Sequence, residues 1–202
     1  NCVCGGSFFA LVIGSMVLSV LRSRNRKLRY LPPALSVEGV GIKRGLTAVE
    51  AAILLELPLN RVLTMLLFGL LKKRAVTVLK EDPLTLEPVT PLKAKLRDAE
   101  TGFLESIKED GTLDEAKLRT VIVELIKETN KKMKGFSRKE TVAYYRDIVD
   151  RAWKQVTDAS SPEVKSRYVD QNLEWMMMDK EFEERTTRTL GTGPIYMPPW
   201  WA

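Results

Sequence analysis

The side chains that carry out most enzyme chemistry are scarce or poorly spaced in this sequence. The 202-residue chain contains no histidine, so it can hold neither a Ser-His-Asp nor a Cys-His nucleophile pair, and no histidine-ligated metal. Its two cysteines are Cys2 and Cys4, which lie awkwardly close for a disulfide and supply too few ligands for a metal site. We interpret them as small apolar residues. Lipidation, or a metal shared with further sequence, is the alternative.

Carboxylates and glycines give no catalytic pattern either. Acidic residues are abundant, but most lie among basic residues at helix-surface spacing, as in Asp147 and Arg151, which is typical of solvated helix faces. Gly39 and Gly41 lack the third glycine and the preceding strand of a phosphate-binding loop. The sequence has no Glu-x-x-His element for a di-metal site in a helical bundle. We therefore expect a non-enzymatic protein with no catalytic residue, no cofactor and no metal.

The composition indicates a folded chain whose positive charge is unevenly distributed. Hydrophobic residues make up 45% and charged residues 29% of the sequence, which is ordinary for a domain with a packed core. The net charge is +6, yet residues 22–80 hold 12 basic and 3 acidic side chains, whereas residues 81–202 hold 20 and 23. The scarcity of Asn, Gln and His, together with the many charged helix faces, hints at a thermophile.

A long uncharged run opens the chain. Residues 2–21 carry no charge and are about as long as a membrane-spanning helix of roughly 20 residues. The next eight residues contain no acid, and their basic side chains are Arg22, Arg24, Arg26, Lys27 and Arg29. By the positive-inside rule this order predicts a transmembrane helix over residues 1–21, with its N-terminal end outside and the bulk of the chain in the cytoplasm. A signal peptide fits poorly, because its basic residues would come first; a buried core helix is the other alternative.

A compact unit is predicted over residues 46–90, after a basic flank and a Pro/Gly-rich linker over residues 22–45. Thr47, followed three residues later by Glu50, has the pattern of a capping box at the start of a helix. The helix is predicted to continue through about Leu55, and Pro58 breaks it. The sequence thus predicts a short first helix at the beginning of the unit.

A second helix and a hairpin are expected to follow. The helix is predicted over residues 59–73, and two alternating runs, 75–79 and 84–89, flank a turn. Helix, turn, helix and hairpin is the order of a winged helix. An apolar segment, a basic flank, a Pro-Pro linker and a unit containing "LLKKRAVTV" resemble the cytoplasmic part of predicted bacterial and archaeal membrane proteins of unknown function. The resemblance covers residues 1–90 and implies an architecture but no reaction.

The second helix would be the DNA-reading helix of a winged helix. Such a helix needs polar and basic side chains along an exposed face, but residues 65–71 are apolar apart from one glycine. We therefore expect this helix to be buried or to meet another apolar surface, with Met65 and Phe68 as candidate partner contacts. Nucleic acid is disfavoured as a partner, and its candidate contacts are Arg61, Lys72, Lys73 and Arg74.

Residues 91–190 are predicted to form a bundle of three to four helices with short loops. The first helix is expected to start at Thr90 and Pro91, and the second to end at Gly135. The third is expected to start at Ser137, and the fourth to continue through Phe182. Starts are indicated by capping residues and ends by glycines and turns.

Two aromatic or methionine-rich segments near the C-terminus have open interpretations. Trp175, Met176 and Met177 form either a core face or an adaptable protein-contact surface. The Pro/aromatic tail over residues 191–202 contains Tyr196, Trp200 and Trp201. This tail is expected either to pack on the bundle, or to enter a membrane interface or dock on a partner.

Together these patterns predict a mainly α fold class. It comprises one N-terminal transmembrane helix, a small winged helix-like α/β unit and a C-terminal three- to four-helix bundle. The favoured function is a membrane-anchored cytoplasmic interaction or assembly module, a subunit or scaffold of a larger membrane complex. Its expected partners are the membrane and other protein subunits or further copies of the chain. The alternative is a membrane-tethered winged-helix transcription regulator.

Overall fold

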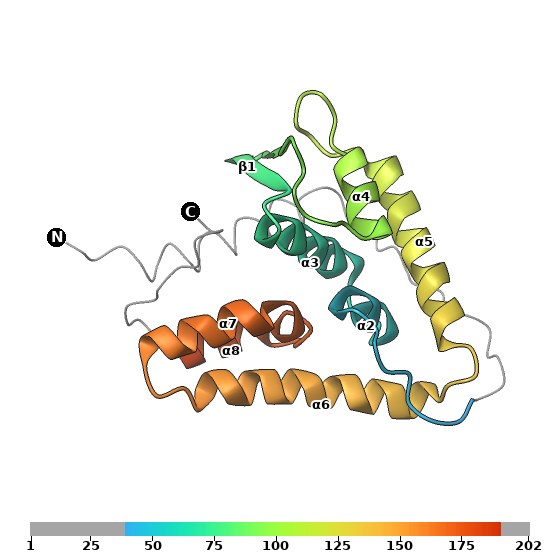
Figure 1. Cartoon of the computed structure of the whole chain (residues 1–202), viewed down its shortest axis with the longest axis vertical. Helices are drawn as coiled ribbons and strands as arrows, with labels where there is room; N and C mark the ends of the chain where they lie inside the picture. Colours follow the sequence, from blue (N-terminus) through green and yellow to red (C-terminus); the bar gives the residue numbers. More distant parts are fainter. Residues whose placement is uncertain (1–38, 191–202) are drawn as a thin grey trace.

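The computed structural model describes residues 39–190. This part of the chain contains seven helices and a two-stranded antiparallel sheet. In chain order the elements are α2 (Ala48–Leu54), α3 (Leu59–Lys72), β1 (Val76–Glu81), β2 (Leu84–Pro88), α4 (Asp98–Glu105), α5 (Glu115–Met133), α6 (Arg138–Thr157), α7 (Pro162–Met176) and α8 (Phe182–Leu190). The central helices α2 and α3 lie between α4 and α5 on one side and α6, α7 and α8 on the other (Figure 1).

The start of α2 has the capping box predicted from the sequence. The Glu50 backbone N–H donates to Thr47 Oγ1 at 3.3 Å, and the Thr47 N–H donates to Glu50 Oε2 at 3.0 Å. Every residue of α2 is buried, so this short helix is stabilised mainly by what packs around it. Pro58 precedes α3, as predicted, because proline fits the entry to a helix but not its interior.

The predicted order of helix, turn, helix and hairpin is observed. β1 pairs with β2 in antiparallel register, with Thr77 opposite Glu87 and Val78 opposite Leu86. The inward-facing Leu86 is 1% exposed and belongs to the hydrophobic core. The hairpin is therefore attached to the helices through its core-facing side chains.

The bundle differs from the prediction at its first helix. No helix forms over residues 89–97, and α4 begins at Asp98, not near Thr90. The Arg97 backbone N–H donates to Glu100 Oε2 at 2.7 Å, which satisfies a donor at the helix start. The side chain of Glu100 thus fixes the beginning of α4.

The fourth predicted helix is divided into two. α7 ends at Met176 and α8 begins at Phe182, with Asp179 in the connection. The Asp179 carboxylate accepts hydrogen bonds from the Glu181 backbone N–H at 3.0 Å and from Arg185 Nη1 at 2.8 Å. These bonds stabilise the turn and explain why apolar residues on both sides do not continue one helix.

One cluster of buried apolar side chains extends from α2 to α8 and includes residues of both strands. Trp153 and Tyr145 of α6 are its largest fully buried members. The Leu46 backbone N–H donates to the Tyr145 hydroxyl at 2.8 Å, joining the segment before α2 to α6. The ranges predicted as separate units, 46–90 and 91–190, therefore share one hydrophobic core.

Between residues 39 and 190, no helix has both the length and the apolar composition needed to cross a membrane. α3 is apolar but has 14 residues, fewer than the roughly 20 that a bilayer requires. α6 has 20 residues but carries eight charged side chains. The transmembrane helix predicted over residues 1–21 lies outside the described residues. We therefore correct the fold class to a mainly helical fold with a small sheet. No described helix supports the predicted single-pass membrane localisation.

Candidate functional site

A partly open cavity of about 720 Å³ lies between the central helices and the α4–α5 pair. Side chains of α2, α3, α4 and α5 line it, and Glu174 reaches it from α7. We call this cavity the α3–α5 groove. Its size is within the range of protein binding pockets, roughly 300–1,000 Å³. The apolar part of its lining consists of Val49, Met65, Leu66, Ala99, Val121 and Leu125.

Two glycines determine how closely the helices approach around the groove. A Cβ added to Gly102 of α4 would lie 2.8 Å from Val121 Cγ2 of α5, so these two helices are in close contact there. A Cβ added to Gly69 of α3 would lie 3.6 Å from Glu100 Oε1 and 3.8 Å from Glu174 Oε1. The missing side chain at Gly69 leaves room into which two carboxylates point.

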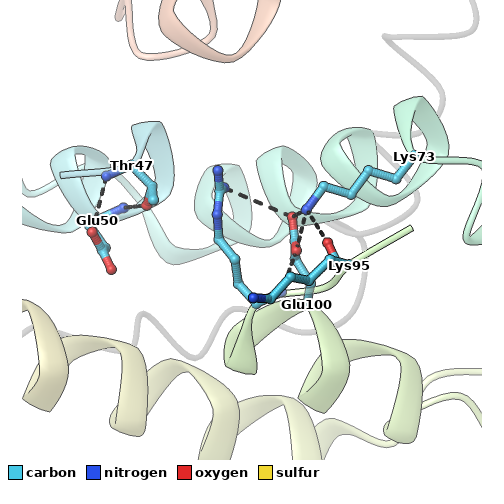
Figure 2. Close-up of polar contacts among 6 residues, drawn as sticks. Thr47, Glu50, Lys73, Lys95 and Glu100 are labelled. Carbon is cyan, nitrogen blue, oxygen red and sulfur yellow. Dashed lines mark hydrogen bonds and ion pairs between the residues drawn. The ribbon is translucent and has the colours of Figure 1, made fainter. Parts of the chain in front are cut away.

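Four of the carboxylates that line the groove are held by ion pairs within the chain. Glu100 is 4% exposed, and its Oε2 lies 2.5 Å from Lys73 Nζ of α3. Figure 2 shows Lys73 reaching from α3 to Glu100, and the capping bonds between Thr47 and Glu50. Glu50 is 7% exposed and lies 2.6 Å from Lys132 Nζ. Glu124 and Glu128 pair with lysines along α5.

The remaining carboxylates of the lining have no such partners. Among residues 39–190, the side chains of Asp98, Glu105 and Glu174 make neither a hydrogen bond nor an ion pair with the rest of the chain. Glu174 is partly buried, whereas Asp98 and Glu105 are exposed. The lining as a whole holds seven acidic and three basic side chains, although the chain has a net charge of +6. The groove lining is therefore acidic, although the described residues 39–190 as a whole hold 27 basic and 25 acidic side chains.

Each basic side chain of the groove lining is already engaged. Lys132 pairs with Glu50, and Arg97 Nη1 lies 3.9 Å from Glu100 Oε1. Lys117 Nζ donates to the Glu105 backbone carbonyl at 3.0 Å. The partnerless charged side chains of the lining are thus all negative.

The structure places three of the four candidate nucleic-acid contacts in bonds within the chain. Arg61 donates to the Asp179 backbone carbonyl. Lys72 Nζ lies 3.5 Å from Asp170 Oδ1, and Lys73 binds Glu100. Arg74, directly after α3, is exposed. Seven of the 14 residues of α3 are buried and the other seven are partly buried, in agreement with the burial expected for this helix.

The candidate partner contacts lie mostly in the core. Met65, Phe68, Met176 and Met177 are between 0% and 7% exposed, and Met65 also lines the groove. Trp175 is partly buried and stacks on Tyr145, with 5.9 Å between ring centroids. These side chains build the interior and do not form an exposed contact surface.

The other candidates lie outside the described residues. They are the aromatic residues of the tail, Tyr196, Trp200 and Trp201, and the basic flank, Arg22, Arg24, Arg26, Lys27 and Arg29. Within the described residues, no group of three or more Cys, Asp or Glu side chains is arranged to hold a metal ion.

The carboxylates of the acidic groove come from four separate helices, so their proximity is not visible in the sequence. Glu50 was predicted only as part of a capping box, and Glu124 only as one of the solvated acids on helix faces. Gly69 was the available signal, since a glycine in the middle of an apolar helix costs about 1 kcal/mol relative to alanine.

Comparison of the chain with protein-family models, with curated proteins and with solved structures finds no match.

Proposed function

We propose that this chain is a non-enzymatic interaction module that binds a partner protein in the α3–α5 groove. The observation that carries the proposal is the groove itself, an open cavity of about 720 Å³ with an apolar lining and partnerless carboxylates. Clefts of about this size with an apolar lining and a few polar groups are typical ligand sites of proteins. This similarity supports a bound partner in the groove.

Reading of DNA by α3 has less support. A reading helix must present its side chains to base edges in the major groove, but α3 is covered by α4 on one side and α7 on the other. Arg61, Lys72 and Lys73 would have to leave their present partners to reach phosphates. These contacts favour a protein ligand over a nucleic acid.

The proposal can be tested by photo-crosslinking in cells that express the full chain. p-Benzoylphenylalanine is placed at Thr120, an exposed residue of α5 that lines the groove. The matched control carries the same probe at Ala143, an exposed position of α6 outside the groove. We expect a crosslinked protein adduct with the probe at Thr120 and none with the probe at Ala143. Equal adducts at both positions, none at Thr120, or adducts with nucleic acid alone would contradict the proposal.

A further inference from the structure

We infer that the partner of the α3–α5 groove presents a basic segment that also carries apolar side chains, such as the charged and apolar faces of a short helix. This inference rests on the proposed function and adds the chemistry of the partner. It follows from three features of the groove: the identity of its partnerless charges, the cost of covering them, and the apolar surface beside them.

The partnerless charges are all of one sign. Asp98, Glu105 and Glu174 have no polar partner among the described residues, whereas the basic side chains of the lining are bonded within the chain. The described residues 39–190 hold 27 basic and 25 acidic side chains, so a general excess of acid does not account for this asymmetry. The groove therefore attracts cations and repels acidic partners, which gives specificity as well as faster association.

Covering these carboxylates has a cost that depends on the partner. A carboxylate taken out of water is strongly destabilised unless a cation or hydrogen-bond donors replace the water. Glu174 is already partly buried, so a neutral segment lying over it would leave an unpaired charge. Lys or Arg side chains on the partner would pair with Glu174 at the inner part of the groove and with Asp98 and Glu105 at its exposed edge.

The apolar lining requires more than a cation. The partly exposed apolar residues of the lining are Ala99 of α4 and Val121 of α5, whereas Met65, Leu66 and Leu125 are at most 7% exposed. Apolar surface removed from water contributes about 25 cal/mol per Å². The part of α5 that lines the groove extends from Lys117 to Lys132, which is about 22 Å at 1.5 Å per residue. This length matches about four turns of a partner helix, which could place apolar side chains on one face and basic residues at its edges.

The test uses the full chain and a fluorescent peptide, RSRNRKLRYL, which repeats residues 22–31 and joins five basic residues to Leu, Tyr and Leu. Two control peptides replace either the five basic residues by Gln or the three apolar residues by Ser. Binding is measured by fluorescence anisotropy. The chain variants are Glu174→Lys in the groove and Glu184→Lys on α8, an exposed acid outside the lining, which changes the net charge equally.

We expect RSRNRKLRYL to bind the full chain more tightly than either control peptide, with an affinity that falls as salt is raised. Glu174→Lys should weaken binding at least about tenfold, whereas Glu184→Lys should change it less than about twofold. An equal effect of the two variants would show general charge attraction and overturn the inference, as would equal binding of the Gln peptide. These two results would leave the crosslink at Thr120, and with it the proposed module, untouched.

A third outcome concerns the chain's own basic segment. If the full chain fails to bind the peptide, but binds it after Arg22, Arg24, Arg26, Lys27 and Arg29 are all changed to Gln, the occupant of the groove is this segment and not a partner. That result would overturn the inference. Failure of both proteins to bind the peptide would overturn it as well.

Discussion

The two sides of α3 differ in how they are covered. Toward α7 the helix is closed by buried methionines, Met176 to Met178, and by bonds from Arg61 and Lys72 to the α7–α8 region. Toward α4 and α5 it borders a cavity, and Gly69 leaves room for the carboxylates of Glu100 and Glu174. One apolar helix thus supplies core packing on one side and borders an open cavity on the other.

The packed side should be most sensitive at Trp153. This side chain is 0% exposed and contacts the Phe182 ring, with 6.1 Å between centroids, and the Arg185 guanidinium. We expect Trp153→Ala to lower the free energy of unfolding by about 3–5 kcal/mol, the usual cost of truncating a buried aromatic residue. Urea denaturation of the full chain measures this loss. Val123→Ala, at an exposed position of α5, is the control, and a similar loss there would contradict the comparison.

On the groove side, the largest effect on stability is expected at Glu100. Glu100→Ala removes the partner of Lys73 and the acceptor for the Arg97 backbone N–H. We expect a loss of about 1–3 kcal/mol, since the donors left behind are only partly desolvated. A double-mutant cycle with Lys73→Met, followed by urea denaturation, isolates the pair. A coupling energy near zero would mean that this ion pair does not hold α3 to α4.

The hydroxyl of Tyr145 joins the packed side to the segment before α2. Tyr145→Phe leaves the Leu46 backbone N–H without its acceptor, and we expect a loss of about 1–2 kcal/mol at neutral pH from the unsatisfied buried donor. Thermal and urea denaturation measure the change. An unchanged free energy of unfolding would show that this hydrogen bond makes no net contribution to stability.

The effect of Tyr145→Phe on the free energy of unfolding should also depend on pH. Burial raises the pKa of Tyr145 above its ordinary value of about 10, so the folded chain keeps this proton to higher pH than the unfolded chain. The resulting stability is fully present below pH 10 and is lost as pH rises from about 10 through the raised folded pKa. The difference in unfolding free energy between the wild type and Tyr145→Phe should therefore shrink above about pH 10. A constant difference from about pH 8 to about pH 11 would contradict the burial effect.

The smallest change in the free energy of unfolding is expected for Gly69→Ala. A methyl group there would make ordinary contacts of 3.6 and 3.8 Å with Glu100 and Glu174, and alanine favours the helix over glycine. We expect Gly69→Ala to raise the free energy of unfolding by about 0.5–1 kcal/mol, measured by urea denaturation. A destabilised variant would show that the groove is tighter at this point than its geometry indicates.

Much of the element order could be predicted from local signals. Thr47 and Glu50 marked the start of α2, Pro58 the start of α3, and Ser137 the start of α6, because capping and proline chemistry act within a few residues. The late start of α4 and the break at Asp179 were not predicted, although the Glu100 and Asp179 carboxylates bind backbone N–H groups two or three residues away and are local signals of the same kind. The bond from Arg61 to the Asp179 carbonyl joins residues 118 apart and could not be predicted from the sequence.

The acidic groove could not be predicted from the sequence. Its carboxylates come from α2, α4, α5 and α7, so their proximity is a property of the packing of these helices. The partners of Lys72 and Lys73 are likewise set by the packing of the helices and not by the local sequence. They had the composition of a phosphate-binding helix end, but the fold brings Asp170 and Glu100 beside them.

The comparison between the two sides of α3 is tested most directly by NMR titration of the full chain with RSRNRKLRYL. The account predicts chemical-shift changes at the backbone amides of Gly69, Gly102 and Thr120, which line the groove. It predicts no change at Ala143 of α6 or Glu184 of α8, on the packed side. Changes centred on α6, α8 or the hairpin over residues 76–88, or no change at any amide, would contradict the claim that the open side of α3 is the binding site.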